Sequence, residues 1–70
     1  METITLEVFT DENNHVTKNI HDVKAGDKVM TIGTAELGTV TGPVFDDGFD
    51  WMVPVEINGI EEYYSVLLLY

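Results

Sequence analysis

Cysteine and arginine are absent from this chain of 70 residues, and lysine occurs only three times. Without cysteine there are no disulfide bonds, no thiolate ligands for zinc and no thiol nucleophile, which is a composition that a reducing cytoplasm tolerates. So few lysines cannot supply the positive charge that nucleic-acid binding needs at the phosphates. These absences predict a cytoplasmic protein that does not bind nucleic acid directly.

Long apolar runs are missing as well. The longest one covers residues 66–70, whereas a membrane-spanning helix needs roughly 20 apolar residues. No basic segment precedes an apolar stretch near the amino terminus, as it would in a secretion signal. We therefore expect no membrane association. Hydrophobic residues nevertheless make up 44% of the chain, too many for an acidic disordered tail, so residues 1–70 should fold as a single domain.

Acidic residues are abundant, since 13 Asp and Glu against three Lys give a net charge of −10. Residues 1–28 carry six acids and three lysines, a net charge of −3, whereas residues 29–70 carry seven acids and no base, a net charge of −7. In a body with a radius of gyration of about 11 Å, these carboxylates repel one another within a Debye length of roughly 8 Å. Folding does not require this repulsion. The acidic surface therefore either only keeps the protein soluble or binds a basic partner.

Alternating apolar residues and turn formers indicate β-strands along most of the chain. Strands are expected over residues 2–10, 15–18, 28–32, 37–45 and 51–57, separated by turns, and no segment shows a helical period. The Gly42-Pro43 pair should bend or bulge the fourth strand. Pro54 favours an edge position for the fifth, because proline cannot donate to a strand ladder. An all-β, mainly antiparallel fold follows, and its exposed edge leaves homodimer formation open.

The Asn58-Gly59 pair is the strongest local signal, because a two-residue type I′ turn needs positive φ at both positions. Such a turn sets the register of its hairpin. The expected cross-strand pairs are Ile57 with Ile60, Glu56 with Glu61, Val55 with Glu62, Pro54 with Tyr63 and Val53 with Tyr64. Glu56 and Glu61 would then repel each other on one face. Glu62 would fall among apolar neighbours, which indicates either the mouth of a barrel or an error in this register.

Three motifs together resemble the SH3-like and KOW-type small barrels: Ala25-Gly26-Asp27-Lys28-Val29, Gly38-Thr39-Val40-Thr41-Gly42 and the Asn58-Gly59 hairpin. The resemblance implies a barrel of about five strands over residues 23–70, closed by a short last strand after one helical turn near 65–67, with a strand or hairpin at 1–22 added in front. KOW-type domains often bind RNA or ribosomal and transcription proteins through basic loops. Because no lysine or arginine follows Lys28, only the protein-binding part of this behaviour is expected here.

One segment, residues 45–51, alternates acids with aromatic residues, as contact loops of protein interfaces do. The alternative is a turn whose aromatic side chains only cover the core. The acids and aromatic residues of this segment and of the hairpin after it are the expected partner-binding residues. They are Asp46, Asp47, Phe49, Asp50, Trp51, Glu56, Glu61, Glu62 and Tyr63.

Other chemistry finds little support in the sequence. The aspartates of residues 46–50 lack the spacing of a calcium loop, and the Glu56 and Glu61 pair lacks the pocket in which facing carboxylates act as acid and base. His15 and His21 lie in turn-like sequence without further metal ligands. The only serine, residue 65, has no nucleophile-elbow motif around it. We expect no catalytic residues, no metal site and no cofactor.

These observations favour an inhibitor that occupies the basic, nucleic-acid-binding surface of a partner protein by mimicking DNA. Duplex DNA presents about one charge per 1.7 Å, or roughly 15 phosphates over about 25 Å, and the chain has 13 acids. In composition and size the chain resembles phage-encoded anti-restriction and anti-CRISPR proteins, which would place it in a host cytoplasm. The alternative is a non-inhibitory accessory module of a larger protein assembly, a common role of SH3-like domains.

Overall fold

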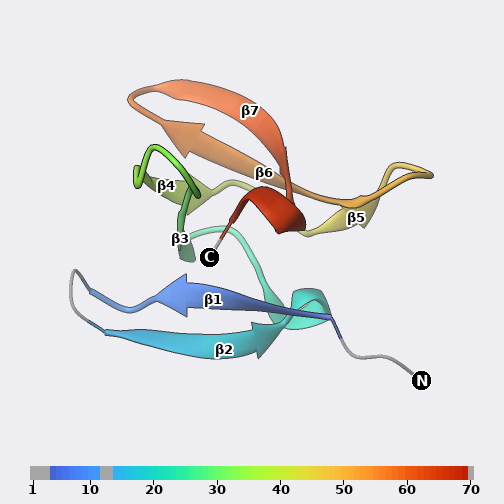
Figure 1. The fold of residues 1–70 in the computed structure, drawn as a ribbon, viewed down its shortest axis with the longest axis horizontal. Coiled ribbons are helices and arrows are strands. Elements are labelled where there is room, and N and C mark those ends of the chain that lie inside the picture. Colours follow the sequence, from blue (N-terminus) through green and yellow to red (C-terminus); the bar gives the residue numbers. More distant parts are fainter. Residues whose placement is uncertain (1–3, 12–13, 70) are drawn as a thin grey trace.

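Residues 4–11 and 14–69 are described by the computed structural model, in which seven strands form one antiparallel sheet (Figure 1). The elements are β1 (Thr5–Phe9), β2 (His15–Asn19), η1 (Ile20–Asp22), β3 (Lys28–Met30), β4 (Leu37–Val40), β5 (Phe45–Asp46), β6 (Trp51–Ile57), β7 (Ile60–Ser65) and η2 (Val66–Leu68), where η denotes a 3-10 helix. The predicted all-β, antiparallel class is confirmed, and the radius of gyration is 11.1 Å. Within these residues, no helix is long and apolar enough to cross a membrane.

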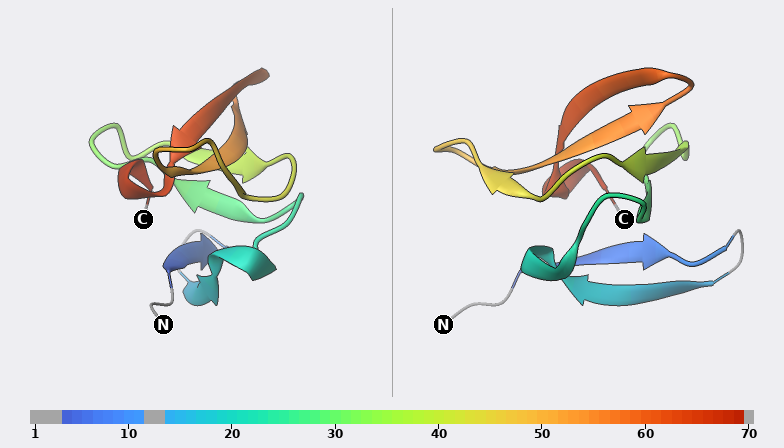
Figure 2. Two further views of the ribbon diagram at one scale, coloured as in Figure 1. Left: turned by 90° about the vertical axis from the view of Figure 1, so that its right-hand side faces the viewer. Right: turned by 180° about the vertical axis from the view of Figure 1, so that it is seen from behind.

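The sheet is open, so the expectation of a closed barrel is wrong for the described residues. The strand order is β2-β1-β3-β4-β6-β5, and β7 pairs with the other edge of β6. Closure would require β2 to pair with β5 or β7. These strands lie far apart in the order, and the two hairpins β1–β2 and β6–β7 stand on opposite sides of the molecule (Figures 1 and 2). Strands β3 to β7 give the about five strands expected over residues 23–70, and β1 and β2 form the expected added hairpin.

The amino-terminal hairpin shares the sheet and the core with the rest of the chain. Its turn is closed by Asn14, whose backbone N–H donates to the Asp11 carboxylate at 3.0 Å; Glu12 and Asn13 of the expected turn lie outside the described residues. Phe9 of β1 pairs with Lys28 of β3. The buried apolar side chains form one cluster that draws on both parts of the chain. Its members are Leu6, Val8, Ile20, Val23, Val29, Val40, Val53, Val55 and Leu69.

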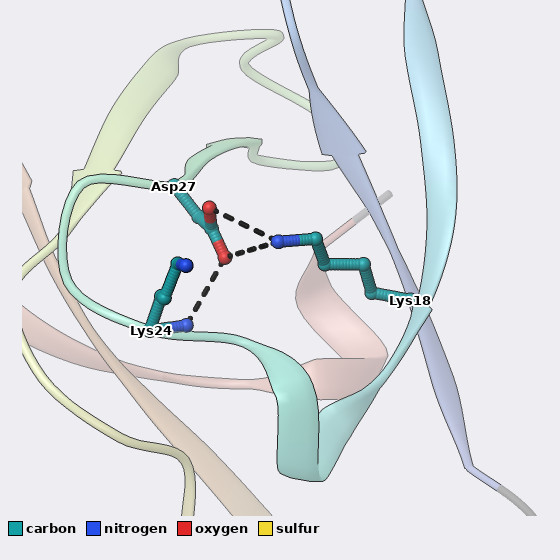
Figure 3. Close-up of polar contacts among 3 residues, drawn as sticks. All are labelled: Lys18, Lys24 and Asp27. Carbon is teal, nitrogen blue, oxygen red and sulfur yellow. Dashed lines mark hydrogen bonds and ion pairs between the residues drawn. The ribbon is translucent and has the colours of Figure 1, made fainter.

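The turn before β3 depends on the backbone conformation of Gly26 and on the hydrogen bonds of Asp27. Gly26 has a φ of +99°, in the left-handed region that favours glycine. The Asp27 carboxylate accepts a hydrogen bond from the Lys24 backbone N–H at 3.0 Å and pairs with Lys18 Nζ at 3.2 Å (Figure 3). The Asp27 carbonyl accepts from the Val40 backbone N–H at 2.7 Å. Asp27 thus joins β2, this turn and β4.

The expected fourth strand, residues 37–45, is interrupted at residues 41–44, where the Gly42-Pro43 pair predicts a bend, and forms β4 and β5 instead. Both pair with β6 along one edge, and β7 covers its other edge, so the predicted edge position of Pro54 is wrong. The Thr41 backbone N–H donates to the Pro54 carbonyl at 2.9 Å. Pro54 therefore turns its backbone toward the break between β4 and β5. No backbone N–H of residue 54 is needed at this break, so proline can occupy a central strand here.

The β6–β7 hairpin has the predicted register. Its pairs are Ile57–Ile60, Glu56–Glu61, Val55–Glu62, Pro54–Tyr63, Val53–Tyr64 and, beyond the prediction, Met52–Ser65. Asn58 and Gly59 have φ values of +55° and +82°, as a type I′ turn requires. The local turn chemistry therefore determines which side chains share a face of this hairpin.

The carboxyl-terminal segment returns to β3. The Ser65 side chain accepts a hydrogen bond from the Leu67 backbone N–H at 3.2 Å and caps η2, close to the predicted helical turn. Leu69 then forms an isolated bridge with Thr31. Strand β3 ends at Met30, earlier than predicted, because the chain turns after Thr31, whose carbonyl accepts from the Ala35 backbone N–H at 3.0 Å.

A glycine lets β4 approach β6 closely. Gly38 is buried, and a Cβ atom there would lie 2.4 Å from Val55 Cγ1 and 2.8 Å from Ile57 Cγ1. Any larger residue would push the two strands apart. The contact between the β3–β4 pair and the β6–β7 hairpin therefore depends on this position.

Candidate functional site

The nine expected partner-binding residues lie in three places. Asp46, Asp47, Phe49 and Asp50 form the turn between β5 and β6, here called the tip turn. Glu56, Glu61 and Tyr63 share one face of the β6–β7 hairpin, here called the outer face. Trp51 and Glu62 lie on the opposite face, with Val53 and Val55. Since Asp50 and Glu56 are separated along one strand, about 20 Å lies between the tip turn and the outer face carboxylates (Figure 1).

The tip turn is held by its own carboxylates. Asp47 accepts hydrogen bonds from the backbone N–H groups of Phe49 at 2.9 Å and Asp50 at 2.8 Å, and Asp46 accepts one from the Gly48 backbone N–H at 2.8 Å. The donors from Asp50 and Phe49 favour the ionised carboxylate and lower the pKa of Asp47 below its ordinary value. Gly48 permits the turn through a φ of +98°. The arrangement keeps Asp47 negatively charged in a fully exposed position.

Phe49 extends from this turn with 93% of its surface exposed. The neighbouring Asp50 side chain is exposed too, and it accepts no hydrogen bond from another described residue. A large aromatic side chain in water is unfavourable by itself. Together with adjacent carboxylates, it has the composition of a contact loop.

On the outer face, aromatic and apolar side chains lie beside the carboxylate pair. Phe45 pairs with Met52 across β5 and β6, and Pro54 pairs with Tyr63 across β6 and β7. The rings of Phe45 and Tyr63 meet edge to face with their centroids 5.4 Å apart. Tyr63 remains 64% exposed and Phe45 39%. This part of the outer face offers a pre-arranged aromatic surface.

The two carboxylates of the outer face lie opposite each other and form no ion pair with a described residue. Glu56 and Glu61 are direct cross-strand neighbours, and like charges in this arrangement destabilise a sheet. Glu61 accepts a hydrogen bond from the Thr41 hydroxyl at 2.8 Å. Among the described residues, ion pairs join only His15 to Glu7 and Lys18 to Asp27, all before residue 29. The acids of the second half therefore have no cationic partner within the described chain.

Trp51 is placed differently from Phe49, although both flank the same turn. Its side chain is half-buried and packs against the core cluster. Its ring meets that of His21 edge-on with a centroid distance of 5.4 Å. Trp51 therefore supports the fold of this region, and its exposed part alone is available to a partner.

Glu62 lies on the opposite face of β7 from Glu61, opposite the buried Val55. It is nevertheless exposed, because β7 is the last strand on its side of the sheet. The Tyr64 hydroxyl donates to the Glu62 carboxylate at 3.4 Å. Desolvation, followed by the charge and the hydrogen bond of Glu62, raises the pKa of the Tyr64 phenol above its ordinary value. The predicted register is therefore correct, and Glu62 lies at an open edge and not at a barrel mouth.

The two histidines contact neighbouring side chains of the fold. His15 begins β2, where it stacks on Phe9 at a centroid distance of 5.5 Å and approaches the Glu7 carboxylate at 3.3 Å. His21 contacts Trp51 from η1. In residues 4–11 and 14–69, no group of three or more His, Cys, Asp or Glu side chains is arranged to hold a metal ion.

Two residues of the outer face were not among those expected from the sequence. Phe45 and Met52 meet on the outer face because β5 pairs with β6 beyond the interruption at residues 41–44. No local pattern predicts this register, since the interruption separates β5 from the strand that precedes it. The alternation of acids and aromatic residues in 45–51 was the available signal.

Comparison with protein-family models, with curated proteins and with solved structures finds no match to this chain. The functional reading therefore depends on the geometry and charge of the molecule itself.

Proposed function

We propose that the protein binds a basic surface of a partner protein and so keeps nucleic acid from that surface. The observation that carries this proposal is the charge distribution: residues 29–70 contain seven acids and no base, and none of the described acids among them forms an ion pair within the chain. Lysine and arginine side chains that pair with phosphate also pair with carboxylates. A partner that normally binds nucleic acid supplies such side chains.

The dimensions of the molecule support this competition. Its longest extent is 32 Å, a length over which duplex DNA presents about 19 charges. The tip turn and the outer face carboxylates lie at the two ends of β6, about 20 Å apart, which corresponds to about 12 phosphates of a duplex. Carboxylates at two separated positions can replace phosphates at both ends of a binding channel.

Aromatic side chains beside the carboxylates add affinity to the electrostatic attraction. Phe49 at the tip turn and Tyr63 on the outer face are exposed by 93% and 64%. Charges at the rim of an interface mainly accelerate association, whereas buried aromatic side chains slow dissociation. Each acidic place on this molecule has one such anchor.

In size and acidity the chain is similar to phage-encoded anti-restriction and anti-CRISPR proteins, and this likeness rests on composition alone. A protein of this kind would act in the cytoplasm of a host cell by occupying its target. The proposed mechanism uses no catalytic residue and no cofactor.

A second function, that of a non-inhibitory accessory module, is favoured by one observation. Six apolar side chains away from the tip turn and the outer face aromatics are exposed by 43 to 73%: Val16, Ile32, Leu37, Ile60, Leu67 and Leu68. Competition by charge does not need them, whereas a module within a larger assembly would cover them.

Affinity capture distinguishes the two functions. The protein is immobilised, a nuclease-treated cell lysate is passed over it, and bound proteins are eluted with added DNA or RNA. The charge-competition proposal predicts that nucleic acid displaces the captured partner. It also predicts that the double variant Asp50→Lys/Glu56→Lys, whose side chains accept no hydrogen bond from other described residues, no longer captures it.

The matched control is the double variant Glu7→Lys/Asp22→Lys, which makes the same change in net charge at acids that precede residue 29. It should still capture the partner, and circular dichroism should show that all variants fold. A partner that nucleic acid does not displace, or that the Asp50/Glu56 variant retains, would overturn the proposal and favour the accessory module.

A further inference from the structure

Strand β7 is an open edge of the sheet. It pairs with β6 over residues 60–65 and with no other strand of the described chain. Next to a two-residue turn, Ile57 and Ile60 form a hydrogen-bonded pair, so Glu62 also directs its backbone groups toward β6. Glu61 and Tyr63 direct theirs away from the sheet, where no described backbone group accepts or donates to them. This row of free donors and acceptors can pair with a further strand.

We propose that the β7 edge takes up an extended, basic segment of the partner protein as an additional antiparallel or parallel strand. This inference rests on the proposed function and specifies how the partner is held. Side chains of the added strand that lie on the outer face would come next to Glu61, with Glu56 in the following strand. Lysine or arginine there relieves the repulsion between these two carboxylates. Their aliphatic stems would lie beside the exposed Tyr63 ring.

Charge complementarity selects this occupant over a second copy of the chain. Two β7 edges pairing with each other would bring Glu61 and Glu62 of one copy next to the same acids of the other, and neither β7 carries a base. An edge strand with a charged residue on its inward face, as Glu62 is here, resists pairing with its own kind. Two other strands end the described sheet: β5 is only two residues long, and β2 carries Lys18, which is already paired with Asp27.

The test uses a synthetic peptide, Lys-Val-Lys-Val-Lys-Val, titrated into the intact protein and followed by amide NMR. Binding through the edge should shift the amide signals of Glu61 and Tyr63 and slow their hydrogen exchange. The same peptide with alternate backbone nitrogens methylated keeps its charge but loses the donors that pair with a strand. It should bind much more weakly, and Glu-Val-Glu-Val-Glu-Val should not bind.

Protein variants locate the contact. Glu61→Gln should weaken peptide binding about threefold, the effect of one exposed ion pair, whereas Asp22→Asn at the end of η1 should leave it unchanged. Equal binding of the methylated peptide, or amide shifts confined to the tip turn, would overturn edge pairing even where affinity capture supports charge competition. Failure of the capture experiment with intact edge pairing would instead reject the proposed function. Dimerisation of the protein through the Glu61 and Tyr63 amides would overturn this inference in favour of a second copy.

Discussion

The two ends of the sheet use charge in opposite ways. In the region of β2 and the turn before β3, Asp27 is buried enough to leave only 13% of its side chain exposed, and it joins Lys18 to the Lys24 backbone. In the β6–β7 hairpin, Glu56 and Glu61 lie side by side and form no ion pair with a described residue, since the lysine on that face, Lys28, donates to the Thr39 hydroxyl beside Glu56. The first arrangement stabilises the fold, and the second weakens it.

The acids of the second half therefore stabilise no ion pair among the described residues, whereas those of the first half do. All three lysines of the chain lie in residues 18–28, and one of them, Lys18, forms an ion pair with Asp27. A single lysine on β7 would have relieved the repulsion on the outer face. The uncompensated charge lies beside the exposed Tyr63 ring, and the proposed function uses this combination.

The largest expected effect on stability concerns the contact between β4 and β6, which connects the two regions. Gly38→Ala places a Cβ atom within 2.4 Å of Val55 and 2.8 Å of Ile57, which forces β4 away from β6. We expect a loss of about 3 kcal/mol in the free energy of unfolding, measured by urea denaturation. Gly42→Ala is the control, because its Cβ would meet Pro54 only at an ordinary contact distance of 3.5 Å. A stability equal to that of the parent protein for Gly38→Ala would show that β4 does not pack against β6 as described.

The next effect tests the stabilising charge directly. Asp27→Ala removes the partner of Lys18 and the acceptor of the Lys24 backbone N–H, and we expect a loss of about 2 kcal/mol in the free energy of unfolding. Asp50→Ala at the exposed tip turn should change it by less than about 0.5 kcal/mol. If both variants lose the same amount of stability, the contrast between the two ends of the sheet is wrong.

Local chemistry made parts of this fold predictable. The Asn58-Gly59 turn sets φ at its own two residues, and every pair of the β6–β7 hairpin follows from it, including the unfavourable neighbours Glu56 and Glu61. A bend or bulge at Gly42-Pro43 was predicted too, because proline and glycine act on their own backbone, but the strand was expected to continue through it and instead divides into β4 and β5.

Features that depend on distant segments were predicted wrongly or missed. Pro54 lies in a central strand because the break between β4 and β5 happens to face it, and barrel closure fails because β2 and β7 do not meet. In the candidate site, Phe49 and Trp51 flank one turn with similar sequence surroundings. Only the packing of Trp51 against the core and His21 distinguishes this half-buried aromatic residue from the exposed Phe49.

A smaller effect, of opposite sign, is expected on the outer face. Glu56→Lys converts the repulsion with Glu61 into attraction and should raise the free energy of unfolding by about 0.5 kcal/mol. The gain should shrink at high salt, which screens exposed charges. In the double variant Glu56→Lys/Glu61→Lys repulsion returns, so the gain should disappear. Urea denaturation at low and high salt measures all three proteins, and a gain that persists in the double variant would show that the two side chains do not interact.

The smallest effect is a change in the pKa of Tyr64, which shows whether this phenol responds to its contact with Glu62 or to the summed charge of the acidic half. The pKa of Tyr64 is raised by desolvation and by the neighbouring Glu62 carboxylate, so the folded state holds the phenol proton more firmly than the unfolded state does. The stability from this contact is present below the unfolded pKa of about 10 and is lost as the pH rises through the raised pKa. Glu62→Gln should lower the pKa of Tyr64, followed through its ring signals by NMR, whereas Glu61→Gln on the opposite face should leave it unchanged. Equal shifts in both variants would mean that Tyr64 responds to the summed charge of the hairpin and not to its own contact, and the acids of the two faces would then act as one electrostatic surface.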